Sequence, residues 1–272
     1  SVSPHTAAVP RSNGLLTRTG GEPVRIERVF PGEAASAFVR HYWLPRWTLP
    51  EGRELRPQVL EYPTANLVIE PGSALLHRAN RGVSGRTLRG TGWAFGMLLR
   101  PGVARGWTGT SLRSLPAVVP VDELAVDGLV ALLPLVRRTM DAGDDAGAVS
   151  AVESWLGGLP LPGDDARLVD EIVATVEADR DLRRVEDLAA RFDLGVRHLQ
   201  RLVAGHIGFG PKWLIQRYRL QEAAAALRSD DPPALATLAL ELGYADQAHF
   251  SREFRAVIGA PPGAYAAREG RR

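Results

Sequence analysis

The hydrophobic positions follow two different periods in the two halves of the chain. From Val24 to about Val119 the apolar residues form short alternating or continuous runs, broken by Gly and Pro: VRIERVF, FVRHYWLPRW, ANLVIE, SALLHR, GRTLRG and WAFGMLLR. Short runs separated by turn residues are typical of an antiparallel β domain. We therefore predict β structure over residues 23–120, preceded by a flexible segment at residues 1–22 that is rich in Ser, Thr, Gly and Pro.

Helical spacing begins after residue 120. The segments LAVDGLVALLPLVRRTM and AGAVSAVESWLGG predict a helical connector over residues 121–158, with a kink at Pro134. The stretch GGLPLPGDD then indicates a linker at residues 159–165, and helical segments fill residues 166–268. The pattern predicts an α+β multidomain protein, in which an antiparallel β domain with a helical segment precedes an all-α domain of seven helices.

An internal repeat occupies most of the all-α part. VEDLAARFDLGVRHLQRLVAGHIGFGP aligns with LATLALELGYADQAHFSREFRAVIGAPP, with one extra residue in the second copy. Each copy has the pattern helix, tight turn, helix, and Asp193 falls at the position of Gly243, where the turn requires a left-handed backbone. This is the layout of a helix-turn-helix motif, whose second helix enters the major groove of DNA.

The second helix of each copy has one apolar face and one polar face. The apolar stripe is Leu199, Leu202, Val203 and Ile207 in the first copy and Phe250, Phe254 and Ile258 in the second. Arg and Gln can make paired hydrogen bonds to guanine and adenine edges. We therefore expect the outward-facing and flanking side chains to bind DNA, namely Arg197, Gln200, Arg201, Gln247, His249, Arg252 and Arg255.

The segment between the two copies, PKWLIQRYRLQEAAAALRS, predicts one long helix. Its roughly 19 residues would form a rod of about 28 Å at 1.5 Å per residue. Successive major-groove faces of B-DNA are about 34 Å apart. Two recognition helices held apart by such a rod can read two consecutive turns of DNA, which explains why the motif occurs twice.

The motif HLQRL…G…P, together with LALELGYADQAHFSREF…G..P, resembles the AraC/XylS family of bacterial transcription regulators over residues 166–268. The resemblance implies a double helix-turn-helix domain. It places the base-facing positions at Arg197, Gln200, Arg201, Gln247, His249 and Arg252. The chain departs from the family where Ala204–Gly205 stands in place of a frequent basic pair, and where Asp193 stands in place of the usual turn glycine.

The segment WAFGMLLRPGVARGWTGTSL is similar, more faintly, to the small β domains that precede this module in many AraC relatives. That similarity implies a cupin-like barrel over residues 23–120 that binds an effector or mediates dimerisation. Trp43, Trp47, Trp93 and Trp107 are candidate effector contacts, although aromatic residues in a small β domain more often belong to the core. The apolar residues of the connector form either a dimer seam or packing within the chain: Leu124, Leu129, Leu132, Leu133 and Val136.

The charge distribution favours a nucleic-acid partner. The net charge is only +2, but residues 1–120 carry 15 Arg against 7 Glu, and residues 183–228 carry nine basic against four acidic residues. A locally basic surface provides phosphate contacts. The chain contains no cysteine, which excludes a DNA-repair methyl acceptor, a class of protein of which some members carry a similar module.

Metal and cofactor chemistry is not expected. Before residue 160 the histidines are His5, His41 and His77, never spaced as HxH, and we find no nucleophile motif or phosphate loop. No apolar run is long enough to cross a bilayer and no export signal is evident, so we expect a cytoplasmic protein without a membrane partner.

The sequence thus predicts a DNA-binding transcription regulator that is not an enzyme. Its candidate partners are double-stranded DNA, RNA polymerase, an unidentified small-molecule effector and a second copy of the chain. The alternative is a small-molecule-binding β-barrel enzyme with an accessory DNA-binding module.

Overall fold

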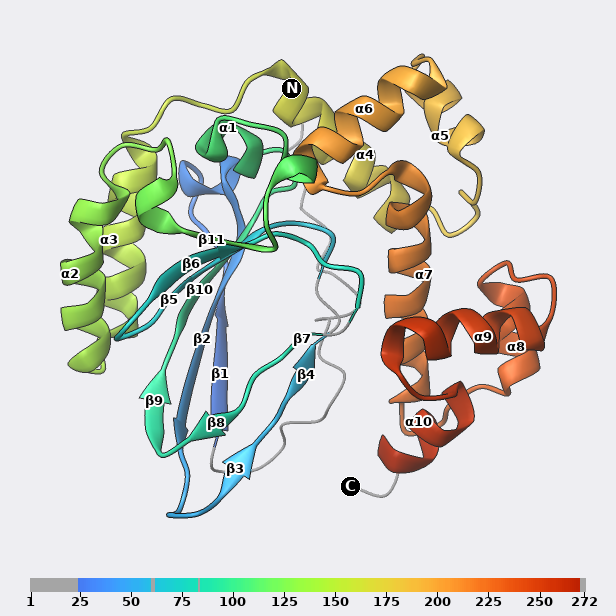
Figure 1. The fold of residues 1–272 in the computed structure, drawn as a ribbon, viewed down its shortest axis with the longest axis horizontal. Helices are drawn as coiled ribbons and strands as arrows, with labels where there is room; N and C mark the ends of the chain where they lie inside the picture. Colours follow the sequence, from blue (N-terminus) through green and yellow to red (C-terminus); the bar gives the residue numbers. More distant parts are fainter. Residues whose placement is uncertain (1–23, 60–61, 83, 270–272) are drawn as a thin grey trace.

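The computed structural model describes residues 24–59, 62–82 and 84–269. The segment expected to be flexible, residues 1–22, lies outside the described residues. Figure 1 shows an antiparallel sheet in the middle of the molecule, with the helix pair α2 and α3 on one side and the helices α4 to α10 on the other. We call the described residues of 24–157, with the sheet and α1 to α3, the β half, and residues 164–269, with α4 to α10, the helical half. The two halves therefore lie side by side.

The main sheet has the strand order β1-β2-β10-β5-β6-β11, and every pairing is antiparallel. The long strand β2 lies between β1 and β10 in this order, and it also pairs with β9. The strands are β1 (Val24–Val29), β2 (Val39–Thr48), β5 (Asn66–Ile69), β6 (Ala74–His77), β9 (Thr91–Trp93), β10 (Phe95–Leu99) and β11 (Val118–Pro120).

The expectation of a closed cupin-like barrel is wrong for the described part of the chain. The strands β1 and β11 are the opposite edges of the sheet and do not pair with each other. The segments available to close it form only two short ladders, β3 (Glu54–Leu55) with β8 (Leu88–Arg89) and β4 (Gln58–Val59) with β7 (Ser84–Gly85). These segments are rich in Arg, Gly and Pro, so they offer few apolar side chains to extend a ladder.

The connector forms two helices, α2 (Leu129–Asp141) and α3 (Asp145–Gly157), that cover one face of the sheet. Leu129, Leu133 and Val136 are buried in one core with residues of the sheet. Leu124 and Leu132 are partly buried against the same core. All five candidate seam residues therefore pack within the chain.

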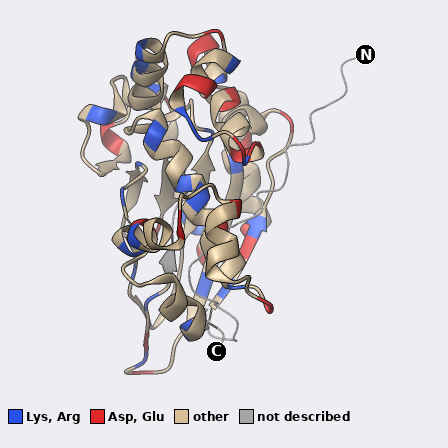
Figure 2. Cartoon of the chain, turned by 90° about the vertical axis from the view of Figure 1, so that its right-hand side faces the viewer, with Lys and Arg blue, Asp and Glu red and all other residues tan. Residues whose placement is uncertain are grey.

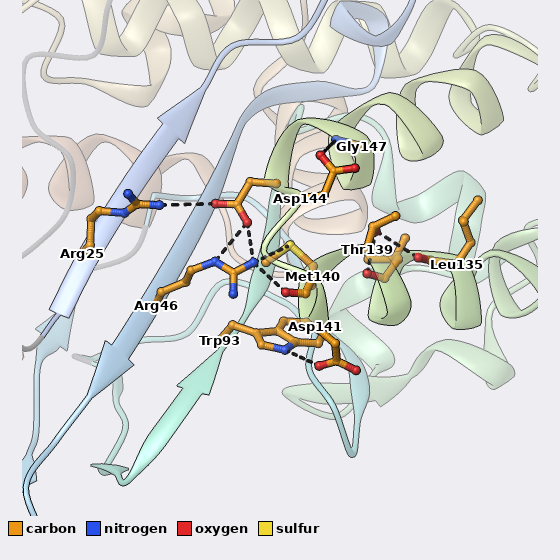
Figure 3. A network of polar contacts seen from close by, with 11 residues as sticks. Arg25, Arg46, Trp93, Leu135, Thr139, Met140, Asp141, Asp144 and Gly147 are labelled. Atoms are coloured by element: carbon orange, nitrogen blue, oxygen red, sulfur yellow. Dashed lines mark hydrogen bonds and ion pairs between the residues drawn. The ribbon is translucent and has the colours of Figure 1, made fainter.

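Polar contacts fix this helix pair to the sheet (Figure 3). Arg46 of β2 donates hydrogen bonds to Oδ1 of Asp145, from Nε at 3.0 Å, and to the carbonyl oxygen of Met140 at 2.7 Å. The indole nitrogen of Trp93 donates to Asp141 at 2.8 Å. The turn between α2 and α3 is thus held at one end of the sheet.

Seven helices lie in the described part of the helical half, residues 164–269, as predicted. The long helix α7 contributes to two hydrophobic cores: Leu214 and Tyr218 belong to the first, whereas Leu220 and Leu227 belong to the second. Its 17 residues form a rod of about 25 Å. No described helix is both long and apolar enough to span a bilayer. The helices are α4 (Asp164–Ala178), α5 (Val185–Arg191), α6 (Val196–Ile207), α7 (Pro211–Leu227), α8 (Leu235–Glu241), α9 (Gln247–Ile258) and α10 (Pro262–Glu269).

The first of these two cores also includes residues of the β half, namely Tyr62, Ala79 and Leu98. A charged pair joins the same two halves, because Arg40 of β2 donates to both carboxylate oxygens of Glu177 at 2.9 Å. The described members of the second core all come from residues 220–265. Among the described residues, the β half thus shares a hydrophobic core with the helices around α6, whereas the buried residues of the second core all come from the helical half.

Asp170 of α4 gives this interface a predicted pH dependence. Its Oδ1 accepts a hydrogen bond from the backbone N–H of Gly102 at 2.8 Å, and burial raises the pKa of its carboxyl from 3.8 to about 6. Between these values the folded state holds a proton that the unfolded state has lost, so this group makes stability fall as the pH rises from about 4 to about 6.

Asp170→Asn keeps the acceptor oxygen and removes the charge. We expect it to raise the free energy of unfolding at pH 7 by up to roughly 3 kcal/mol, from about two pKa units at 1.36 kcal/mol each. Urea titrations of both proteins between pH 4 and pH 7 measure the difference. A difference that stays constant across this range would show that Asp170 is not the titrating group.

Candidate nucleic-acid interface

The two copies of the repeat have the same backbone conformation at their turns. Asp193 has a φ of 53° and Gly243 a φ of 81°, both in the left-handed region predicted from the alignment. In each copy the residue after this position donates its backbone N–H to the helix before it, from Leu194 to Ala189 and from Tyr244 to Ala239, both at 2.9 Å. The left-handed turns are therefore confirmed.

The first recognition helix is α6. Its predicted apolar stripe is buried: Leu199, Leu202, Val203 and Ile207 belong to the core that α4 and α7 share. On the opposite side, the Arg197, Gln200 and Arg201 side chains are exposed, and none has an ion pair or hydrogen bond with another described residue. These donors are consequently available to a ligand outside the chain.

The second recognition helix is α9. Asp246 caps its N-terminus, since its carboxylate accepts the backbone N–H of His249 at 2.7 Å. Phe250, Phe254 and Ile258 are buried as predicted. The remaining predicted contacts on this helix are exposed, namely Gln247, Arg252 and Arg255.

His249 differs from the other predicted DNA contacts because its side chain already contacts two other residues of the protein. Its side chain is half-buried, and Nε2 lies 3.4 Å from Oε1 of Glu253. Its ring also meets the Tyr244 ring edge-on, with the centroids 5.3 Å apart. A base contact by His249 would compete with these two interactions.

Figure 2 turns the helical half toward the viewer and shows Lys and Arg positions distributed over several of its helices. Acidic positions on the same half gather on α4, which contains Asp164, Asp165, Asp170, Glu171 and Glu177. The recognition helices themselves contain Glu253 as their only acidic residue. The charge on the two exposed faces therefore suits a polyanion.

The β half covers the end of α6, a contact that was not predicted from the sequence. A short helix, α1 (Ala104–Thr108), and the turn η2 (Leu112–Ser114) pack against this end, where Ala204 and Gly205 are buried. A signal was present in the sequence, since Ala204–Gly205 interrupts the polar face of the recognition helix with two small residues. Small residues on a helix face permit close packing of another segment.

The four tryptophans considered as effector contacts lie in different environments. Trp93 and Trp107 belong to the core between the sheet and α2–α3, and Trp47 belongs to a separate small cluster. Trp43 is the half-buried one: its indole nitrogen donates to Oδ1 of Asn66 at 3.0 Å, and its ring covers Gly96. The structure thus does not bring the four rings together into one site.

Comparison with known protein families gives two matches. Residues 188–268 match a family described as a helix-turn-helix domain. Residues 27–117 match a domain of unknown function (DUF6597). The first match contains both recognition helices, and the second contains most of the sheet.

Comparison with individual proteins gives partial alignments. The chain is 33% identical over 158 residues to a putative AraC-like transcription regulator of Streptomyces lividans, covering 56% of this chain and 46% of that relative. It is 37% identical over 107 residues to the HTH-type transcriptional activator RhaS of Escherichia fergusonii, covering 38% and 37%. The chain thus spans less than half of the length of these relatives.

Solved structures give weaker likenesses. The fatty acid-bound ToxT of Vibrio cholerae is 11% identical with a TM-score of 0.38, covering 92% of this chain and 97% of that one. The C-terminal domain of AraT from Geobacillus stearothermophilus is 23% identical with a TM-score of 0.33, covering 38% and 84%. The matched helix-turn-helix family, the AraC-like and RhaS relatives and the two equivalent motifs described above thus agree on a similarity to AraC-type transcription regulators over part of this chain.

Proposed function

We propose that the protein is a transcription regulator that binds double-stranded DNA through α6 and α9 in two successive major grooves. The observation that carries the proposal is the pair of exposed Arg- and Gln-bearing faces, one on each copy of the motif. The helix α6 packs against α7, and α9 contributes to the second hydrophobic core together with α7, so α7 connects the two recognition helices. The base contacts in the proposal are Arg197, Gln200, Arg201, Gln247, Arg252 and Arg255, with His249 after release from Glu253.

The proposed division of the chain follows the change of pattern along it. Residues 23–120 with the connector 121–158 form the regulatory part, and residues 166–268 form the DNA-binding part beyond a linker at 159–165. The regulatory part would sense a small molecule or form a dimer, and it would have no catalytic activity. A regulator of bacterial genes acts beside the chromosome, so the proposal places the protein in the cytoplasm.

A specific place on the sheet supports the sensing role. Trp43 alternates along β2 with Tyr42 and Leu44 of the core that includes α2 and α3, so it lies on the opposite face of the sheet, where the residue is half-buried and its ring covers Gly96. An indole with an exposed face can stack on a flat or apolar ligand. Trp47, Trp93 and Trp107 are buried in other clusters, so they would not contact such a ligand.

Selection from a pool of random-sequence DNA duplexes tests the proposal. The purified full chain is expected to retain duplexes with two conserved blocks about one helical turn apart. A variant that combines Arg201→Ala and Arg252→Ala is the matched control, and it should lose both blocks. Retention of duplexes without any shared sequence would contradict a sequence-specific reader and favour the alternative, an enzyme with an accessory DNA-binding module.

Arg201→Ala alone should weaken binding to the selected duplex by about 1–3 kcal/mol and relax base choice in one block only. The reason is that Arg201 lies in the middle of the exposed face of α6 and has no partner among the described residues. Repeating the selection with the variant measures both effects. An unchanged preference at every position would remove Arg201 from the base contacts.

A further inference from the structure

The polar face of α6 is exposed to solvent over only the first half of the helix. Successive residues of an α-helix are 100° apart, so Arg197, Arg201 and Ala204 lie along one side and Gly205 lies next to it. Arg197 and Arg201 are exposed, but Ala204 is only 6% exposed. The β half covers the second half of the same face, through α1 and η2.

An arginine of the β half occupies the space beside Gly205. A Cβ atom placed on Gly205 would overlap Nη1 of Arg105, and it would lie 3.8 Å from Oγ of Ser111. Arg105 therefore lies where a longer side chain at position 205 would project. The Arg105 side chain nevertheless belongs to an exposed residue, and it forms no ion pair with another described residue.

A second arginine lies on the same covering segment. Leu112 of η2 is adjacent to the end of α6, since its carbonyl oxygen is 3.6 Å from a Cβ placed on Gly208. The next residue, Arg113, is exposed and also has no ion pair with another described residue. The β half thus presents two unpaired cations close to the end of the recognition helix.

The recognition helix itself has no cation at this end. No Lys or Arg occurs between Arg201 and Lys212. His206 lies at this end of α6, but burial lowers the pKa of its imidazole, and this outweighs the opposite effect of its hydrogen bond to the carbonyl oxygen of Leu202, so the neutral form is favoured. A helix in the major groove is bordered by phosphate groups, and cations beside it fix its position on the duplex.

We infer that Arg105, together with Arg113, binds the phosphate backbone beside the groove that α6 reads, so that the DNA-binding surface includes part of the β half. This inference rests on the proposed function. It assigns the ligand as a DNA phosphate group, and it gives the β half a direct contact with DNA in addition to any sensing role. The opposite arrangement, in which the β half blocks α6, predicts effects of the opposite sign.

The test uses the full-length protein and a duplex selected by it from random-sequence DNA. Arg105→Ala should weaken binding about 5- to 10-fold at 0.1 M salt, equally for the selected duplex and for variants of it. The plot of log affinity against log salt concentration should become less steep by about 0.9, the value for one phosphate contact. Adding Arg113→Ala should lower the slope again by a similar amount.

Arg53→Ala is the matched control, because Arg53 is also an exposed arginine of the β half and precedes β3, which Figure 1 places at the opposite end of the sheet from α6. Arg53→Ala should leave the slope of log affinity against log salt concentration unchanged. Arg105→Lys, which keeps the positive charge, should give the same slope as the unmodified chain. A slope that Arg105→Ala leaves unchanged, or an affinity that it increases, would overturn the inference. If no duplex is enriched even by the unmodified chain, the proposed function fails instead, so the two failures are distinguishable.

Discussion

Phe254→Ala is expected to lower the free energy of unfolding of the second motif by about 3–5 kcal/mol, the usual cost of removing a buried phenyl ring. Phe254 of α9 is fully buried. Its ring packs edge-on against both Phe250 and Tyr265, with centroid separations of 5.7 and 5.5 Å. The cavity would lie at the centre of the core that holds α8, α9 and α10 together.

The loss of stability should be confined to the second motif, because the described members of this core include no residue of the β half. Thermal unfolding followed by circular dichroism should change from one transition to two, with the new transition at lower temperature. Arg255→Ala, one residue further along α9, is the control and should change stability by less than about 0.5 kcal/mol, because Arg255 is exposed. A single cooperative transition in the variant would show that the two cores unfold as one unit.

Acidification should destabilise the protein through His41, by up to roughly 5 kcal/mol at 1.36 kcal/mol per pKa unit. His41 of β2 is only 5% exposed, and its Nδ1 has no hydrogen-bond partner among the described residues. Burial, together with the guanidinium groups of Arg28 and Arg40, lowers the pKa of its imidazole from 6.5 to about 3. Between these values the unfolded state binds a proton that the folded state does not, so stability falls as the pH falls from about 6.5 to about 3.

His41→Phe should flatten this dependence, because a phenyl ring fits among the neighbouring rings of Phe30 and Tyr62 and has no proton to bind. Urea titrations between pH 4 and pH 7 measure the slope. The same substitution at the exposed His198 is the control and should leave the loss at low pH in place. A slope that persists in His41→Phe would exclude His41 as its cause.

The helix-turn-helix motifs could be predicted from the sequence more completely than the arrangement of the sheet. The stripes at Leu199 and Phe250, and the left-handed turns at Asp193 and Gly243, were predictable because local helix periodicity and turn chemistry determine them. The repeat added an internal check, since two copies had to satisfy the same pattern. The resemblance to a family then assigned a chemistry to the exposed faces.

Long-range pairing could not be predicted in the same way. The runs VRIERVF and WAFGMLLR predicted strands correctly, but nothing in them shows that β1 ends as an edge and that the sheet stays open. The contact between Arg105 and Gly205 joins positions about 100 residues apart, and no local pattern encodes it. Ala204–Gly205 was visible as an interruption in a polar face, but its partner was not.

In the proposed complex, one chain places two recognition helices in two successive major grooves. Missing-contact footprinting of the full chain on its selected duplex tests this arrangement, because it identifies each base that contributes to binding. We expect two groups of contacted bases on one face of the duplex, about 10 base pairs apart from centre to centre, with Arg201→Ala weakening one group and Arg252→Ala the other. A single group of contacted bases, or two groups that both respond to either substitution, would contradict it.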